Sequence, residues 1–261
     1  MTEEVSAAHI ALAEALADAA GAIIRRYFRQ PIAVDEKSDL TPVTIADRAA
    51  EAAMRALIEQ RFPEHGIIGE EHGSARAEAE HVWVLDPIDG TKSFISGMPL
   101  FGTLIALTRR GRPVLGIIDQ PILRERWLGA AGRPTTLNGA PVRTRACAAL
   151  DRATLFSTAP ELMFQGVDAA GFARLRAAVK LVRAGGDCYA YAQLASGFID
   201  LVVEAQLKPY DYCALAPVIA GAGGTITDWQ GHALDLAADG RVLACGDPAL
   251  AAPARALLAG G

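Results

Sequence analysis

The stretch HVWVLDPIDGTKSF, residues 81–94, constrains the fold more than any other part of the chain. An apolar run typical of a buried β-strand ends directly in two acids, Asp86 and Asp89, that flank a proline. Because the proline stiffens the turn, both carboxylates and the carbonyl of Ile88 can be directed at one point. Hard divalent cations prefer oxygen ligands of this kind. An Asp after a strand is also a common turn former, so the pattern alone leaves both interpretations open.

Two neighbouring features favour the cation site. The stretch IIGEE places Glu70 and Glu71 after another short apolar run, and acids gathered at two strand ends repel each other unless a cation binds. Gly90 lets backbone N–H groups approach an anion, and the residues after it can begin a helix. Thr91 adds a hydroxyl that can hold a water. Together these features indicate the hydrolysis of a phosphate ester.

Two other acidic signatures do not fit. The aspartyl-phosphate phosphatases of the haloacid dehalogenase type carry Asp-x-Asp-Gly-Thr, whereas the two acids here are three positions apart. A calcium-binding EF-hand loop needs alternating acids and a glutamate at its last position, and this stretch has neither. The motif therefore predicts neither an aspartyl-phosphate chemistry nor a calcium loop.

The apolar pattern predicts helices over residues 4–29 and 45–61, followed by an antiparallel sheet. Thr44 and Asp47 fit a capping box, which places Asp47 in the first turn of the second helix. Pro217 falls inside a later expected helix, which must therefore bend or begin further along the chain.

From about residue 150, strand-like and helix-like segments alternate, which indicates an α/β half. We therefore expect an α+β protein in which residues 1–261 form a single body. Its antiparallel-rich half, residues 1–149, carries the metal and phosphate motifs. Its α/β half, residues 150–261, carries Asp211 and the residues that select the substrate. The cleft between the halves is the expected site.

The composition restricts the partners. The apolar fraction of 51% is ample for a large core. The formal net charge of −5, with scattered basic residues, argues against a nucleic-acid partner, which needs a clustered basic face. No apolar run is expected to reach the length that spans a membrane. The N-terminal segment carries Glu14 and Asp18 inside its apolar pattern, unlike a signal or transit peptide. We expect a cytoplasmic protein without a membrane partner.

Three acidic motifs occur in a specific order and spacing: GEE at 69–71, DPIDGTKSF at 86–94 and KPYDYCALAPVIAGAGG at 208–224. They resemble the metal-site motifs of the inositol monophosphatase family, the lithium-sensitive, magnesium-dependent phosphatases. The stretches KSDLTPVTIAD and LNGAPVRT fit as well. The resemblance implies a layered α-β-α-β-α sandwich of the sugar-phosphatase-like fold. It also implies Mg²⁺ as cofactor, with about two or three ions per site, a small phosphorylated metabolite as substrate, and a homodimer.

The resemblance also implies a set of metal ligands. Glu70, Asp86 and the carbonyl of Ile88 hold a first magnesium in this reading. Asp86, Asp89 and Asp211 hold a second, and Glu70 also binds a more weakly held third ion. Such ions lower the pKa of a water and stabilise both the attacking and the leaving oxygens.

Further residues are expected to act on the water and the phosphate. By the same resemblance, the catalytic residues are Thr91, Asp47 and Glu70, with Thr91 and Asp47 paired to orient the attacking water. The backbone groups of Gly90 and Thr91 contact the phosphate. Lys37 and Glu71 are further candidates, and Lys37 is either a positive charge brought to the site or a solvated surface lysine.

The stretch RAGGDCYAYAQLASGFIDLVVEAQLKPYDY resembles the histidinol-phosphate phosphatase branch of the family. Arg183 and Asp187 match positions that reach the substrate in relatives. Asp187, Glu204 and Asp211 together favour a cationic alcohol, because histidinol phosphate carries an amine and an imidazole. Their structural alternatives are a surface salt bridge for Arg183, a helix cap for Asp187 and a structural acid for Glu204. The expected substrate-binding residues are Asp89, Gly90, Thr91, Arg183, Asp187, Glu204 and Asp211.

Two other functions stay open. The same chemistry can act on inositol-1-phosphate, a sugar bisphosphate or a 3′-phosphoadenosine nucleotide. A regulatory binding module that keeps the fold without catalysis would need a missing ligand, whereas every expected metal carboxylate is present in the sequence.

Overall fold

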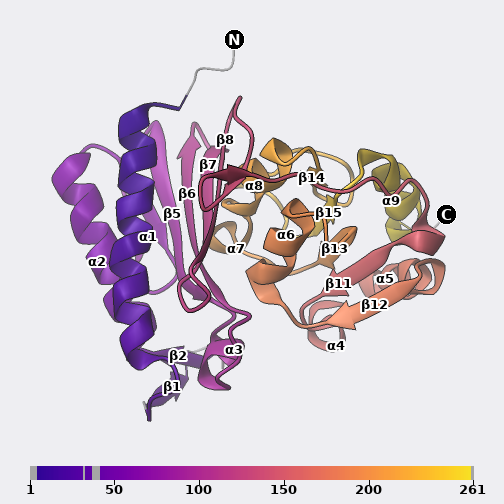
Figure 1. Cartoon of the computed structure of the whole chain (residues 1–261), viewed down its shortest axis with the longest axis horizontal. Helices are drawn as coiled ribbons and strands as arrows, with labels where there is room; N and C mark the ends of the chain where they lie inside the picture. Colours follow the sequence, from indigo (N-terminus) through magenta and orange to yellow (C-terminus); the bar gives the residue numbers. More distant parts are fainter. Residues whose placement is uncertain (1–4, 32, 37–41, 260–261) are drawn as a thin grey trace.

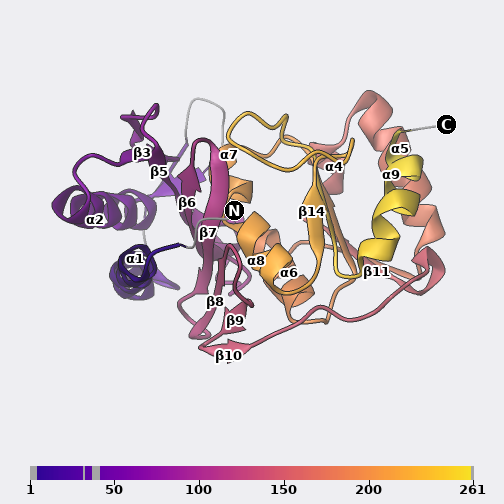
Figure 2. The same ribbon diagram turned by 90° about the horizontal axis from the view of Figure 1, so that it is seen from above.

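The structure, a computed structural model, describes residues 5–31, 33–36 and 42–259. Its two large sheets alternate with three layers of helices, as Figures 1 and 2 show from perpendicular directions. The expected α-β-α-β-α sandwich is therefore confirmed. Lys37 lies outside the described residues, so its expected role stays a prediction.

The first sheet has eight strands and belongs to the N-terminal half. All its neighbours are antiparallel except β3 and β5, which run parallel. In spatial order the strands are β10 (Ala140–Pro141), β9 (Thr136–Leu137), β8 (Glu125–Ala130), β7 (Arg112–Gln120), β6 (Gly102–Arg109), β5 (His81–Asp89), β3 (Gly66–Gly69) and β4 (Gly73–Ala75).

Two long helices, α1 (Ala7–Tyr27) and α2 (Ile45–Arg61), cover the outer face of this sheet (Figure 1). Ser6 caps α1 by accepting the N–H of His9. The capping box expected for α2 is confirmed, because Thr44 and Asp47 bond reciprocally at its start. A separate two-stranded pair precedes α2, formed by β1 (Val34–Glu36) and β2 (Pro42–Thr44), which the sequence pattern did not predict.

Helix α1 is long and apolar enough to cross a membrane by its length and composition, so the expectation that no apolar run reaches that length is wrong. In the structure its apolar side chains Leu12, Leu16 and Ile24 are buried against α2 and the sheet. Core helices of soluble proteins meet the same criterion, so the helix is weak evidence for a membrane span.

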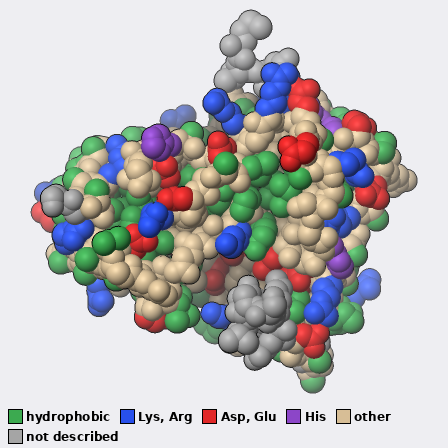
Figure 3. All heavy atoms as spheres, turned by 180° about the vertical axis from the view of Figure 1, so that it is seen from behind, with side chains coloured by type: hydrophobic (Ala, Val, Ile, Leu, Met, Phe, Trp, Pro, Cys, Tyr) green, Lys and Arg blue, Asp and Glu red, His purple; other side chains and the backbone are tan. Residues whose placement is uncertain are grey.

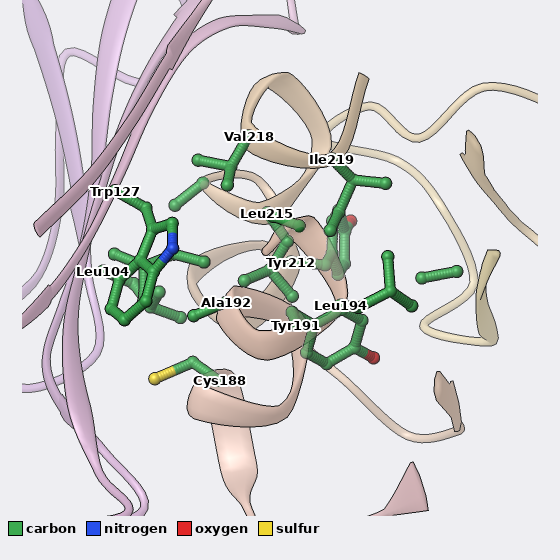
Figure 4. Close-up of a cluster of buried hydrophobic side chains, with 14 of the residues drawn as sticks. Leu104, Trp127, Cys188, Tyr191, Ala192, Leu194, Tyr212, Leu215, Val218 and Ile219 are labelled. Atoms are coloured by element: carbon green, nitrogen blue, oxygen red, sulfur yellow. The ribbon is translucent and has the colours of Figure 1, made fainter. Parts of the chain in front are cut away.

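The middle layer packs helices against the inner face of the first sheet. It consists of α6 (Asp187–Ala195), α7 (Pro209–Tyr212) and α8 (Leu215–Gly221). Figure 4 shows Trp127 and Leu104 from the strands facing Cys188, Ala192 and Leu215 from these helices. This layer therefore joins the two sheets through one continuous apolar core.

The second sheet is mixed. Strand β11 (Thr154–Ser157) runs parallel to β12 (Leu181–Ala184) and to β13 (Leu201–Glu204), as the α/β alternation predicts. Strands β13, β15 (Val242–Cys245) and β14 (Thr225–Thr227) pair antiparallel. The outer face is covered by α5 (Gly166–Ala178) and α9 (Ala251–Ala259). The short helices α3 (Thr91–Ile95), α4 (Pro160–Met163), η1 (Leu150–Arg152) and η2 (Pro248–Leu250) complete the described chain.

The proline conflict is resolved by a break in the helix. The segment after Lys208 forms two helices, α7 and α8, and Pro217 is the third residue of α8. A proline in the first turn removes an N–H that has no partner within the helix, so it is tolerated there. The expected helix thus begins later, and the break sets α7 apart as a short turn carrying Asp211.

Candidate metal and phosphate site

The end of β5 is bent where the two acids of the motif lie. The register between β5 and β6 shifts between Asp86 and Asp89, which marks an irregularity of the β-bulge kind. Thr103 on β6 fixes this segment, because its hydroxyl donates a hydrogen bond of 2.8 Å to the carbonyl of Pro87. Such bends re-aim side chains at functional sites.

Helix α7 brings a third carboxylate to this bend. It packs against β5, and Asp211 Oδ2 accepts a hydrogen bond of 2.7 Å from the backbone N–H of Lys208. Carboxylate oxygens of Asp86, Asp89 and Asp211 lie within 4.8 Å of one another. The structure thus brings together acids that are far apart in the sequence.

Glu70 lies beside this cluster at the end of β3. Because β3 runs parallel to β5, their carboxyl ends meet at the same edge, and the N–H of Glu70 donates to the carbonyl of Leu85 at 3.2 Å. Burial raises the pKa of Asp86 well above its usual value, and the nearby Glu70, Asp89 and Asp211 raise it further. Burial likewise raises the pKa of Asp211 to about 7, with Glu70 contributing. Four acids therefore share one partly desolvated site.

This arrangement fits a bound divalent cation. The Oδ1 atoms of Asp86 and Asp47 are buried and have no hydrogen-bond partner among the described residues. Buried carboxylate oxygens are normally hydrogen-bonded or coordinated, and burying them unsatisfied is costly. An all-oxygen set of carboxylates suits Mg²⁺ rather than zinc or copper. The donor set thus suits a hard divalent cation such as Mg²⁺.

Asp47 and Thr91 flank the cluster without a direct bond between them. Asp47 is fully buried, and its Oδ2 accepts hydrogen bonds from the Thr44 N–H and hydroxyl. The hydroxyl of Thr91 donates to the carbonyl of Ile88 at 3.1 Å. The expected pair of Thr91 and Asp47 is therefore not a hydrogen bond in this structure, and its joint action on a water stays a prediction.

Gly90 forms the turn between β5 and α3. Its φ is +88°, in the left-handed region that favours glycine, and its carbonyl accepts the N–H of Phe94 to start α3. The expectation that Gly90 and Thr91 begin a helix is confirmed.

One residue that positions the site was missed in the sequence. Glu51 on α2 is fully buried, and it accepts hydrogen bonds from the N–H groups of Glu71 and His72. A Cβ on Gly69, the last residue of β3, would lie 2.0 Å from Glu51 Oε1, so the Glu51 carboxylate occupies the space that this glycine leaves open. The available signal was helical spacing, since Glu51 lies one turn after Asp47.

Glu71 itself is half-buried in this turn, next to Glu70. The structure shows its backbone N–H bound to Glu51. A role of the Glu71 side chain in the site therefore stays a prediction.

The expected substrate residues occupy two places. Asp187 and Glu204 line a small pocket together with Asp89 and Asp211. Glu204 is buried and accepts hydrogen bonds from the Thr158 N–H and the Tyr191 hydroxyl; burial raises its pKa to about 7.

Arg183 lies elsewhere. It is exposed on β12, its guanidinium carbon is 5.9 Å from the ring centroid of Phe156, and it is not among the residues that line this pocket. On the face in Figure 3, acidic side chains gather in a hollow near the centre, while basic side chains are scattered around it. This face shows no continuous basic patch.

Comparison with known proteins identifies the family. A sequence model of the inositol monophosphatase family matches residues 6–259. The bifunctional phosphatase IMPL2 of Arabidopsis thaliana chloroplasts is 57% identical over 85% of this chain, which spans 64% of that protein. The histidinol-phosphatase of Chlorobaculum parvum is 38% identical, covering 89% of this chain and 90% of that protein.

A solved structure agrees with the fold. An inositol monophosphatase from Zymomonas mobilis superposes with a TM-score of 0.89 and 49% sequence identity, covering 98% of this chain and 100% of that one. The matched region contains the acidic cluster at the ends of β3 and β5 and on α7. The chain belongs to the inositol monophosphatase family, whose members are metal-dependent phosphatases of small phosphorylated substrates.

Proposed function

We propose that this phosphatase hydrolyses L-histidinol phosphate to L-histidinol and phosphate, the phosphatase step of histidine synthesis, with Mg²⁺ as cofactor. The main support for this substrate is that Asp187 and Glu204 line the same pocket as Asp89 and Asp211. Acids outside the metal cluster suit a leaving group that carries an ammonium and an imidazole. The histidinol-phosphatase from Chlorobaculum parvum supports this substrate. We further propose that the protein acts in the cytoplasm as a homodimer.

The metal ligands we propose are the cluster acids and one carbonyl: Glu70, Asp86, Ile88, Asp89 and Asp211. When bound, the cations lower the pKa of a water and stabilise negative charge on the attacking and leaving oxygens. The β5 bend and the capped start of α7 support this set, because they restrict the backbones that carry Asp86, Asp89 and Asp211.

The remaining site residues orient the reactants. We propose that Asp47 and Thr91 orient the attacking water. The Oδ1 of Asp47, unpartnered among the described residues, and the hydroxyl of Thr91 beside the Ile88 carbonyl support this role. The backbone N–H groups at Gly90 and Thr91 are proposed to bind the phosphate. In this arrangement the half over residues 1–149 supplies the phosphate site, and the half over 150–261 supplies Asp211 and the leaving-group pocket.

Arg183, Lys37 and Glu71 have weaker support. Arg183 is exposed beside Phe156, so we propose that it meets a substrate only at the rim of the site. Lys37 and Glu71 remain proposed contributors of charge near the cluster.

A second substrate is also supported. The Zymomonas mobilis protein, 49% identical, is an inositol monophosphatase, which favours inositol-1-phosphate. The two alcohols differ in charge, because inositol is neutral.

Steady-state kinetics with Mg²⁺ decide between them. We expect kcat/KM for histidinol phosphate to exceed that for inositol-1-phosphate by about tenfold or more, equivalent to about 1.4 kcal/mol in transition-state binding. A preference of that size for inositol-1-phosphate would show that the proposed substrate is wrong. Asp89→Asn should be inactive on both esters while remaining folded, and wild-type activity in that variant would contradict the metal role.

A further inference from the structure

Asp187 lies against the phosphate-motif turn in an uncommon backbone conformation. Its φ is +45°, in the left-handed region that non-glycine residues rarely adopt, although Asp tolerates it better than most. A Cβ on Gly90 would lie 2.8 Å from its Cγ. The carboxylate therefore fills space that only a glycine at position 90 leaves open, and the two motifs fit against each other.

The side chain of Asp187 does not cap its own helix. Gly186 is the N-cap residue of α6, and no side-chain capping bond is formed there. Instead, the start of α6 forms hydrogen bonds to residues of the N-terminal half. The hydroxyl of Ser93 on α3 donates a hydrogen bond of 2.8 Å to Asp187 Oδ2, and the next N–H, that of Cys188, donates to Asp89 Oδ2 at 2.5 Å. The structural alternative of a helix cap thus does not apply to Asp187.

We propose that Ser93 is a positioning residue for substrate selection, whose hydroxyl fixes the Asp187 carboxylate where a cationic leaving group binds. The inference rests on the proposed function, because Asp187 lines the pocket that we assign to the leaving group. Ser93 holds Oδ2 of a carboxylate that lines this pocket, so the hydroxyl fixes the orientation in which the carboxylate meets a ligand cation. Without the Ser93 hydroxyl, the Asp187 side chain can adopt more rotamers. A bound ligand must then order it, which lowers the affinity for that ligand.

The Ser93 hydroxyl reaches the proposed site through Asp187. Ser93 is two residues beyond Thr91 on α3, and its hydroxyl bonds to Asp187 rather than to a cluster acid. Removing it should therefore change the affinity for the leaving group more than the chemical step. This separation makes a split between KM and kcat the informative readout.

The test compares Ser93→Ala and Ser93→Thr with Ser96→Ala, a matched control that removes an exposed hydroxyl from the end of the same helix. With histidinol phosphate we expect Ser93→Ala to raise KM about tenfold with little change in kcat. Ser93→Thr keeps the hydroxyl, so its KM should stay close to that of the wild type. Ser96→Ala should have the KM and kcat of the wild type. With inositol-1-phosphate, Ser93→Ala should change KM less than about twofold.

A double-mutant cycle shows whether Ser93 acts through Asp187. Asp187→Gly removes the carboxylate and suits the left-handed backbone, so Ser93→Ala should have no further effect in that background. Additive losses, or equal losses on both esters, overturn the proposal. If the wild type prefers inositol-1-phosphate, the proposed substrate fails, whereas the Ser93 proposal is still decided by the cycle measured with histidinol phosphate, the cationic ester. Thermal unfolding of every variant confirms that it is folded.

Discussion

The buried carboxylate of Glu51 accepts a hydrogen bond of 2.7 Å from the backbone N–H of Glu71. Its other oxygen, Oε1, accepts the N–H of His72 at 3.1 Å and the Arg55 guanidinium at 2.7 Å. Helix α2 therefore holds the turn that follows β3, in which Glu70 lies. Since Asp47 is on the same helix one turn earlier, α2 fixes two of the proposed site residues at once.

Replacing Glu51 should damage both stability and metal use. Glu51→Ala leaves the Arg55 guanidinium and two backbone N–H groups without their partner, so we expect the free energy of unfolding to fall by about 3–5 kcal/mol. We also expect the Mg²⁺ concentration for half-maximal activity to rise about tenfold, because the Glu70 turn is no longer held. Denaturant unfolding and a Mg²⁺ titration measure the two effects. Glu59→Ala, an exposed position on the same helix, should change stability by less than about 0.5 kcal/mol; equal losses in both variants would contradict the role of Glu51.

The acidic cluster should lower the stability of the metal-free protein, because its carboxylates are gathered for metal binding. Burial, and then the neighbouring Asp187 and Asp211, raise the pKa of Asp89, so its charged form is disfavoured without a cation. Asp89→Asn should therefore raise Tm by a few degrees in the presence of a chelator, and Mg²⁺ should raise Tm in the wild type but not in the variant. Differential scanning calorimetry with and without Mg²⁺ measures both shifts. A Mg²⁺-dependent rise in the variant equal to that of the wild type would rule out Asp89 as a ligand; Glu161→Gln, an exposed acid, is the control.

The features that the sequence predicted correctly depend mostly on residues close together in the chain. The capping box of Thr44 and Asp47 and the start of a helix after Gly90 depend on residues a few positions apart, so their patterns were sufficient. The layered fold followed from the spacing of the acidic motifs and their family resemblance. The gathering of Asp86, Asp89 and Asp211 was expected from that resemblance, and no residue-level pattern places α7 against β5.

Long-range contacts explain what the sequence did not show. The bond from Glu71 to Glu51 joins residues 20 positions apart, and the bond from Ser93 to Asp187 joins residues 94 apart. Their partners depend on how α2 meets β3 and how α6 meets α3, which periodicity within one segment does not encode. The role of the buried Glu51 therefore follows from the packing of α2 against the turn after β3 and not from its own segment.

A cluster of rings at the far end of β5 contains a histidine with a lowered pKa. Trp83 donates its indole N–H to His65 Nδ1 at 3.2 Å, and the His65 ring stacks on Phe62 with centroids 4.5 Å apart. The pKa of His65 is lowered to about 4, chiefly by burial and in addition by the neighbouring His81, while Glu64 opposes the shift. The folded state therefore keeps this ring neutral where the unfolded chain protonates it.

Stability should consequently fall as the pH decreases from about 6.5 to about 4. In this window the unfolded state binds a proton that the folded state does not, so the contribution of His65 is complete above pH 6.5 and is lost on the way to pH 4. The loss amounts to about 2 kcal/mol by pH 4.5. His65→Gln keeps an acceptor for Trp83 and removes the titration, so the difference in unfolding free energy between pH 7 and pH 4.5 should shrink by that amount. Urea unfolding at both pH values measures it, and an unchanged difference in His65→Gln would place the acid sensitivity at other groups.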